Sequence, residues 1–354
     1  MFWIRDHRDV TRTMDMANDN YLLRINNLQT HFLTEKGAVP AVDGVSFHVN
    51  KGELLGIVGE SGSGKSVTAL SIMGLVDEPG KIVGGEILFD NKNLAKYTDK
   101  QMRKIRGKDI AMVFQEPLTS LNPVFTIGNQ LREALLQHQA LSKTEAKNMS
   151  VEMLNTVGIP RAERVYHSFP HSLSGGMRQR VMIAMALSCK PKLLIADEPT
   201  TALDVTIQAQ VLELMKDLVK KVDTAIVFIT HDLGVVAELV NRVIVMYAGQ
   251  VVEQAEVRQL FKNPRHPYTR GLIESTPKIN DTNEELFSIR GTTPIPSEMP
   301  QGCRFHPRCS YVTDYCVEHM PLLEQQEDGR SEVRCWLYNE EFMVTYGVKN
   351  GKDA

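Results

Sequence analysis

The chain alternates strand-like and helix-like patterns of hydrophobic residues over most of its length. Between residues 21 and 49, apolar and polar residues alternate, as expected for strands that bury one face. Continuous apolar runs of strand length follow at residues 54–58, 110–114, 193–196 and 225–229. Segments with helical spacing lie between most of these runs. Because strands that alternate with helices usually form a covered, mostly parallel sheet, we expect an α/β fold.

Residues 116 to about 178 have a different character. Apolar residues follow helical spacing at 131–139 and 145–157, and Pro123 and Pro160 interrupt the segment. We expect a helical insertion in the α/β core over this stretch.

The two ends of the chain depart from the central pattern. Beyond about Phe261 the periodicity fades, and proline, arginine and cysteine become frequent. The first twenty residues carry many charges and no apolar segment of signal-peptide length. The expected division is a disordered leader over residues 1–20, a main domain over 21–260 and a separate C-terminal extension over 261–354.

Composition excludes several classes of protein. The 354 residues are 42% hydrophobic and 23% charged, which is typical of a globular protein. The net charge of −3 gives no reason to expect nucleic acid as a partner. No apolar run approaches the roughly 18–20 residues of a membrane helix, and five cysteines are too few for a secreted disulfide scaffold of this size. We expect a cytosolic protein that docks on a membrane through other proteins.

The residues after the first apolar run of the core have a phosphate-binding pattern. In order they are Gly59, Glu60, Ser61, Gly62, Ser63, Gly64, Lys65 and Ser66. Glycines allow successive backbone N–H groups to face phosphate oxygens, and the start of the following helix adds partial positive charge. Lys65 can reach the β- and γ-phosphates, and the Ser66 hydroxyl can ligate Mg²⁺. A chance glycine-rich turn is the alternative, but the preceding strand and the Lys-Ser pair favour a nucleoside triphosphate site.

Two acidic residues, Asp197 and Glu198, follow another apolar strand. An acid at the carboxyl end of such a strand can hold Mg²⁺, and its neighbour can polarise an attacking water. Acids at strand ends are common, so the pair gains meaning only beside the phosphate loop.

A second anion-binding pattern occurs at Ser174, Gly175 and Gly176, which precede a helix. A plain helix cap is the simpler interpretation of these residues alone. One ATP does not need two phosphate cradles on one chain, however. We therefore infer that the second cradle serves ATP bound to a partner subunit.

Taken together, these motifs resemble those of the ATP-binding cassette (ABC) ATPase family over about residues 21–260. The matching stretches, in chain order, are the Walker A motif at 59–66, the Q-loop glutamine Gln115, the signature motif at 173–177, the Walker B motif at 193–198, the D-loop at 202–204 and the switch histidine His231. The resemblance implies a P-loop NTPase fold with a mostly parallel core sheet, an antiparallel β-subdomain and a helical subdomain.

The resemblance also implies roles for single residues in ATP hydrolysis with Mg²⁺. Glu198 would be the general base, His231 would contact the γ-phosphate, and Gln115 would contact Mg²⁺ or the attacking water. Ser66, Gln115 and Asp197 would form the magnesium site. Asp204 would bridge to the partner, and the Ser174–Gly176 cradle would cover the partner's ATP.

Four cysteines, Cys303, Cys309, Cys316 and Cys335, stand near the C-terminus with gaps of five, six and eighteen residues. These gaps are wider than those of most structural zinc sites, and four thiolates would also suit an iron–sulfur cluster. Spacing alone leaves zinc, iron–sulfur and unligated thiols open. His306 and His319 lie among them as further candidate ligands.

Residues 263–269 and 302–309 look like the C-terminal region of oligopeptide, dipeptide and nickel importer ATPases. This resemblance implies ATP-driven import of di- or oligopeptides, with nickel, glutathione or cationic peptides as alternative substrates. It favours a [4Fe–4S] cluster on the four cysteines over Zn²⁺. Residue spacing gives no physical reason for the His-Pro-Tyr-Thr run at 266–269.

The implied partners are a second, similar or identical ABC ATPase subunit, two transmembrane permease subunits and an extracytoplasmic peptide-binding protein. The chain would lie peripherally at the cytoplasmic face of the cell membrane. A rival is a cassette ATPase that acts on nucleic acid or ribosomes, but this sequence has neither a long coiled-coil insertion nor a second cassette. A non-enzymatic iron–sulfur sensor is disfavoured because Glu198 and His231 are both present.

Overall fold

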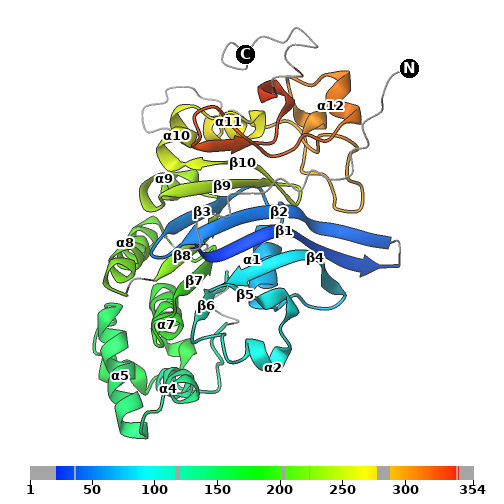
Figure 1. Ribbon diagram of the computed structural model, residues 1–354. Coiled ribbons are helices and arrows are strands. Elements are labelled where there is room, and N and C mark those ends of the chain that lie inside the picture. The colour runs from blue at the N-terminus through cyan, green and yellow to red at the C-terminus, as the bar shows by residue number, and fades with distance from the viewer. Residues whose placement is uncertain are drawn as a thin grey trace.

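The computed structural model describes residues 21–35, 37–115, 120–200, 204–222, 224–276, 288–339 and 342. The leader expected over residues 1–20 lies outside these ranges. The fold contains two β-sheets, with helices packed around the larger one (Figure 1).

The larger sheet has eight strands in the spatial order β11-β12-β10-β9-β3-β8-β7-β6. The last five strands in this order run parallel to one another. They are β9 (Arg242–Tyr247), β3 (Leu54–Val58), β8 (Ala225–Thr230), β7 (Leu193–Asp197) and β6 (Ile110–Val113). Every residue of β7 and β8 is buried. Burial on both faces explains why these strands are continuous apolar runs in the sequence.

The smaller sheet is entirely antiparallel, in the order β2-β1-β4-β5. Its strands are β1 (Tyr21–Thr34), β2 (Gly37–Asn50), β4 (Gly80–Phe89) and β5 (Lys92–Asn93). Apolar residues of β1, β2 and β4 form one core with helix α1 (Lys65–Met73) and one face of the parallel strands. This core holds α1, and therefore the loop before it, in place. The short helices η1 (Leu94–Lys96) and α2 (Asp99–Met102) follow β5.

Helices occupy the described part of residues 120–187. They are α4 (Ile127–His138), α5 (Lys143–Thr156), α6 (Ala162–Tyr166), η2 (Pro170–Ser172) and α7 (Gly175–Leu187). Helical spacing predicted helices at 131–139 and 145–157, and α4 and α5 cover most of these residues. A capping box between Ser142 and Glu145 fixes the start of α5. Figure 1 shows α4 and α5 at the opposite end of the molecule from α11 and α12.

Two helices and a hairpin complete the core. Helix α8 (Val205–Val222) precedes β8, and α9 (Leu233–Leu239) follows it. Strand β9 then pairs antiparallel with β10 (Gln250–Glu256) to form a hairpin.

The C-terminal segment, which we expected to be a separate extension, packs against the core over its described part. The segment contains α10 (Val257–Lys262), α11 (Pro267–Glu274), η3 (His306–Arg308), α12 (Asp314–Glu318), β11 (Glu324–Gln325), β12 (Ser331–Val333) and η4 (Trp336–Tyr338). Strand β12 pairs with β10, so the segment extends the core sheet. Tyr268 and Phe305 also join the main apolar core. Periodicity fades here because the elements are short, while the packing stays continuous.

Candidate nucleotide site

The predicted phosphate loop connects β3 to α1. Gly59 and Gly64 have φ angles of 153° and 96°, in the region that favours glycine. A Cβ atom at Gly59 would lie 2.2 Å from the carbonyl oxygen of Met246, so only glycine fits between the loop and β9. The loop therefore turns tightly into α1, as the strand–loop–helix pattern predicted.

The Lys65 side chain folds back over this loop. Its Nζ atom donates to the carbonyl oxygens of Gly59 and Glu60, at 2.8 and 2.9 Å. Burial lowers the pKa of Lys65, while the negative charges of Glu198, Asp197 and Glu60 act in the opposite direction. The ammonium group thus lies at the loop that would hold the phosphates.

Two of the three predicted magnesium ligands, Ser66 and Asp197, meet at the start of α1 although they are far apart in sequence. Ser66 Oγ donates to Asp197 Oδ1 at 3.1 Å. Burial raises the pKa of Asp197, and the neighbouring Glu198 charge raises it further. A hydroxyl and a carboxylate are the oxygen ligands that Mg²⁺ prefers, so these two groups fit the expected ion.

The three predicted catalytic residues are connected through Glu198. Its Oε2 atom accepts from Gln115 Nε2 at 3.0 Å, and its Oε1 atom lies 3.3 Å from His231 Nδ1. Gln115, Glu198 and His231 follow β6, β7 and β8, which are neighbours in the sheet. Glu198 has a φ of 47°, a strained conformation for a residue with a side chain. The carboxyl ends of adjacent parallel strands are the usual place for a site in an open α/β sheet.

The second predicted cradle begins helix α7. The Ser174 hydroxyl accepts from the backbone N–H of Met177 at 3.4 Å, which caps the helix. A Cβ atom at Gly176 would lie 2.7 Å from Ile207 Cγ2, so Gly176 allows close packing against α8. Within the described ranges, no hydrogen bond joins Ser174, Gly175 or Gly176 to the loop at 59–66. The two predicted cradles are thus not hydrogen-bonded to each other within the described part of the chain.

Asp204 caps helix α8, because its Oδ1 atom accepts from the backbone N–H of Ile207 at 3.0 Å. The preceding part of the predicted D-loop, residues 202–203, lies outside the described residues. The role of Asp204 between subunits remains a prediction.

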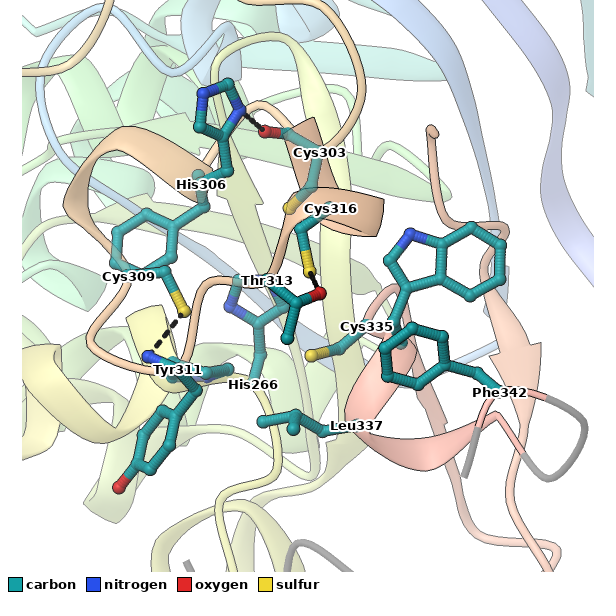
Figure 2. A pocket seen from close by; sticks show the side chains of 13 residues that line it. His266, Cys303, His306, Cys309, Tyr311, Thr313, Cys316, Cys335, Leu337 and Phe342 are labelled. Atoms are coloured by element: carbon teal, nitrogen blue, oxygen red, sulfur yellow. Dashed lines mark hydrogen bonds between the residues drawn. The ribbon is translucent and has the colours of Figure 1, made fainter. Parts of the chain in front are cut away.

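The four C-terminal cysteines, which are far apart in sequence, line one small cavity. Figure 2 shows their sulfur atoms facing the same space, beside aromatic and apolar side chains. The other lining residues include His266, Phe305, Tyr311, Trp336, Leu337 and Phe342. All four cysteines are free thiols. Burial raises the pKa of Cys309 and Cys335 and raises that of Cys303 to about 11.

The cavity has a volume of about 20 Å³, which is about the space that one water molecule needs. Among the described residues, no three His, Cys, Asp or Glu side chains are grouped closely enough to hold a metal ion. His306 Nδ1 lies 2.9 Å from the Cys303 carbonyl oxygen, and His319 stacks on Tyr315. His306 nevertheless lines the cavity together with the cysteines, whereas His319 is not among the lining residues.

The structure supplies a reason for the His-Pro-Tyr-Thr run. Pro267 occupies the first turn of α11, and His266 Nδ1 accepts from the Tyr268 backbone N–H at 3.0 Å. The Tyr268 hydroxyl then accepts from the backbone N–H of Glu60 at 2.8 Å. The run therefore builds a capped helix that touches the phosphate loop, a contact that sequence reasoning missed.

Comparisons with known proteins agree with this geometry. A family model described as "ABC transporter" matches residues 42–201, and one described as "Oligopeptide/dipeptide transporter, C-terminal region" matches residues 252–316. The oligopeptide transport ATP-binding protein AppD of Bacillus subtilis (strain 168) is 58% identical over 321 residues, covering 90% of this chain and 98% of AppD. The dipeptide transport ATP-binding protein DppD of Escherichia coli (strain K12) is 49% identical over 309 residues, covering 87% and 94%.

Among solved structures, the dimeric ATP-binding cassette MJ0796, in a post-hydrolysis state bound to ADP and Pi, is similar with a TM-score of 0.60 and 30% identity. The similarity covers 67% of this chain and 99% of that chain. The resemblance inferred from the motifs is thereby confirmed. The chain is an ABC-type ATPase and belongs to the family of oligopeptide and dipeptide transport ATP-binding proteins.

Proposed function

We propose that this chain hydrolyses ATP at the 59–66 loop and that the hydrolysis powers import of di- or oligopeptides. The observation that carries the proposal is the joined set Gln115, Glu198 and His231 beside the Ser66–Asp197 pair. The relatives named for oligopeptide and dipeptide transport support the substrate class. Nickel, glutathione and cationic peptides remain the alternative cargoes.

The residues divide the chemistry between them. Glu198 acts as the general base and takes a proton from the attacking water, while Gln115 and His231 orient its two carboxylate oxygens. His231 also contacts the γ-phosphate. Lys65 and the backbone N–H groups of the loop bind the phosphates. Ser66, Asp197 and Gln115 would hold Mg²⁺, which when bound would neutralise charge that develops on the transferred phosphoryl group.

We further propose that ATP is enclosed between two such subunits, identical or similar. Ser174, Gly175 and Gly176 at the start of the thirteen-residue helix α7 would cover the γ-phosphate of the partner's ATP. Asp204 would link the two subunits. The dimeric state of the cassette MJ0796 supports this arrangement.

The helical region would contact two transmembrane permease subunits, which receive peptide from an extracytoplasmic binding protein. Three large apolar side chains are exposed in this region: Val124 at 71%, Phe125 at 50% and Phe169 at 40%. Such side chains suit a groove for a cytoplasmic helix of a permease. Within the described ranges, no helix is long and apolar enough to cross a membrane. We propose a peripheral position at the cytoplasmic face of the membrane.

For the four cysteines we propose a [4Fe–4S] cluster, with Zn²⁺ as the alternative. Four soft thiols that face one apolar cavity fit the ligand set of such a cluster. A single Zn²⁺ ion would need the four sulfurs in tetrahedral contact with it, and no such grouping is found among the described residues. Cluster binding would require the cavity to open and the thiols to lose their protons.

Transport by the whole complex tests the function. The chain, its ATPase partner and both permeases are reconstituted in liposomes with the peptide-binding protein, and uptake of labelled dipeptide is measured with and without ATP. We expect ATP-dependent uptake that unlabelled di- or oligopeptide suppresses. Suppression by nickel or glutathione alone would redirect the substrate assignment, and ATPase stimulation by nucleic acid without uptake would contradict the proposal.

A further inference from the structure

Glu60, the second residue of the phosphate loop, has each of its polar groups bound. Its backbone N–H donates to the Tyr268 hydroxyl, and its carbonyl oxygen accepts from Lys65 Nζ at 2.9 Å. Its carboxylate accepts two hydrogen bonds from Arg308, at 2.6 and 3.0 Å, and one from Thr293 Oγ1 at 2.8 Å. Three residues from beyond the cassette sequence thus hold one residue of the nucleotide site.

The groups that hold Glu60 are themselves fixed. The Tyr268 side chain is fully buried, and the Arg308 side chain is only 5% exposed. Arg308 Nε also donates to the Arg290 carbonyl oxygen at 2.9 Å, and its guanidinium lies over the rings of Tyr247 and Phe305. A planar guanidinium held in this way forms a bidentate pair with well-defined geometry.

The pairing matters because of charge. An acid on a phosphate-binding loop would repel a triphosphate, since like charges at short range disfavour binding. Burial raises the pKa of Glu60, but the Arg308 and Thr293 hydrogen bonds together with the Arg308 charge bring it below its usual value. Glu60 is therefore ionised, and Arg308 is the cation that neutralises it directly.

We infer that Arg308 and Tyr268 are positioning residues of the nucleotide site, acting through Glu60 to hold the loop and neutralise its carboxylate. This inference rests on the proposed ATP site at residues 59–66. It makes the C-terminal segment a determinant of ATP affinity. The competing explanation is that Arg308 and Tyr268 only stabilise the fold. Removing the charge of Glu60 distinguishes the two explanations.

The test measures equilibrium binding of labelled MgATP to the full-length chain. Arg308→Met keeps the length of the side chain but leaves Glu60 unpaired, so we expect ATP affinity to fall by about tenfold. Glu60→Gln removes the charge that needs neutralising, so we expect it to lower ATP affinity less than Arg308→Met does. The double variant Glu60→Gln/Arg308→Met should bind ATP about as well as Glu60→Gln alone.

Arg265→Met is the matched control. Arg265 lies in the same segment and is similarly buried. It pairs with Asp328 at 2.7 Å and not with a residue of the phosphate loop. We expect it to lower stability while leaving ATP affinity unchanged. An equal loss of affinity in Arg265→Met and Arg308→Met, or no recovery in the double variant, would overturn the inference in favour of a structural role.

Two more variants keep the test decisive. If Arg308→Met does not fold, Tyr268→Phe removes only the hydroxyl that accepts from Glu60 and should weaken ATP binding about threefold; wild-type affinity would then overturn the inference. Lys65→Ala separates this inference from the proposed site. Full ATP binding by Lys65→Ala would refute the site itself, whereas loss in Lys65→Ala without loss in Arg308→Met would refute only the positioning role.

Discussion

The nucleotide site and the cysteine cavity are both assembled from residues far apart in sequence, but they satisfy their polar groups differently. In the nucleotide site, Ser66 bonds Asp197, and Gln115 and His231 lie against Glu198. In the cavity, thiols face one another among aromatic rings, and burial keeps Cys303 protonated by raising its pKa to about 11. The first region pairs its charged and polar groups with one another, whereas the proposed metal site would need a cation before its thiols could ionise.

The two regions also differ in which of their proposed parts lie within one chain. The nucleotide site has its loop, magnesium ligands and proposed base in one chain, yet its second phosphate cradle makes no hydrogen bond to that loop among the described residues. The cavity has all four sulfurs in one chain but little space between them. The proposed ATP site would be completed by a partner subunit, and the proposed cluster would need the cavity to open.

Among the variants that separate these two regions, the largest predicted change in ATP turnover concerns the cradle. Ser174→Ala removes the hydroxyl expected to cover the partner's γ-phosphate, so ATP turnover by the assembled complex should fall on the order of 100-fold. ATP binding by the separate chain should stay unchanged, as measured by titration with labelled ATP. Ser172→Ala is the matched control, because that hydroxyl donates only to the Phe169 carbonyl in the same turn. Loss of ATP binding by the separate Ser174→Ala chain would assign the cradle to its own site.

The cavity is tested by removing one sulfur. Cys303→Ser should abolish the iron content and visible absorption of anaerobically purified protein. Burial disfavours ionisation of the serine hydroxyl, as it does that of the thiol it replaces. Cys189 lies outside the cavity, and its thiol donates a hydrogen bond to the Ala134 carbonyl oxygen. Cys189→Ser should therefore retain the iron and the visible absorption. Zinc in place of iron in the wild-type chain would support the alternative metal. Wild-type protein without either metal would end the assignment of a metal site.

A smaller effect concerns His266, which lines the cavity and caps α11. Burial and two nearby arginines, Arg334 and Arg270, lower its pKa to about 3, so the folded state holds it neutral while the unfolded state protonates it near pH 6.5. Its contribution to stability is thus present above pH 6.5 and is lost progressively as pH falls towards 3. His266→Asn retains a capping oxygen and should reduce this pH dependence by up to about 1.4 kcal/mol per pH unit. Thermal unfolding between pH 7 and 5.5 measures it; an unchanged slope would contradict a neutral buried His266.

Local patterns predicted the parts of the site that are local in structure. Gly59 to Ser66 join a strand to a helix, and Asp197, Glu198 and His231 end buried strands, so their neighbourhood followed from sheet geometry. The family resemblance supplied the connection between them. Each of these residues stands at the boundary of an element that its own flanking sequence predicts.

Contacts between short, irregular elements could not be predicted in this way. Arg308 reaches Glu60 across 248 residues, and neither residue stands in a pattern that names the other. The pairing of β12 with β10 likewise joins a three-residue strand to the core, too short for period-two alternation to be visible. The convergence of four cysteines on one cavity also depends on these loops, so spacing left their chemistry open.

Glu198 is proposed to be the base of an ATPase whose phosphate loop binds ATP without it. Single-turnover hydrolysis of γ-labelled ATP by the assembled complex, measured beside ATP binding, tests this with Glu198→Gln. The variant keeps the shape and the contact with Gln115 but cannot accept a proton. We predict ATP affinity within about threefold of wild type and hydrolysis reduced by about 10²- to 10⁴-fold. Hydrolysis at the wild-type rate would show that Glu198 is not the base.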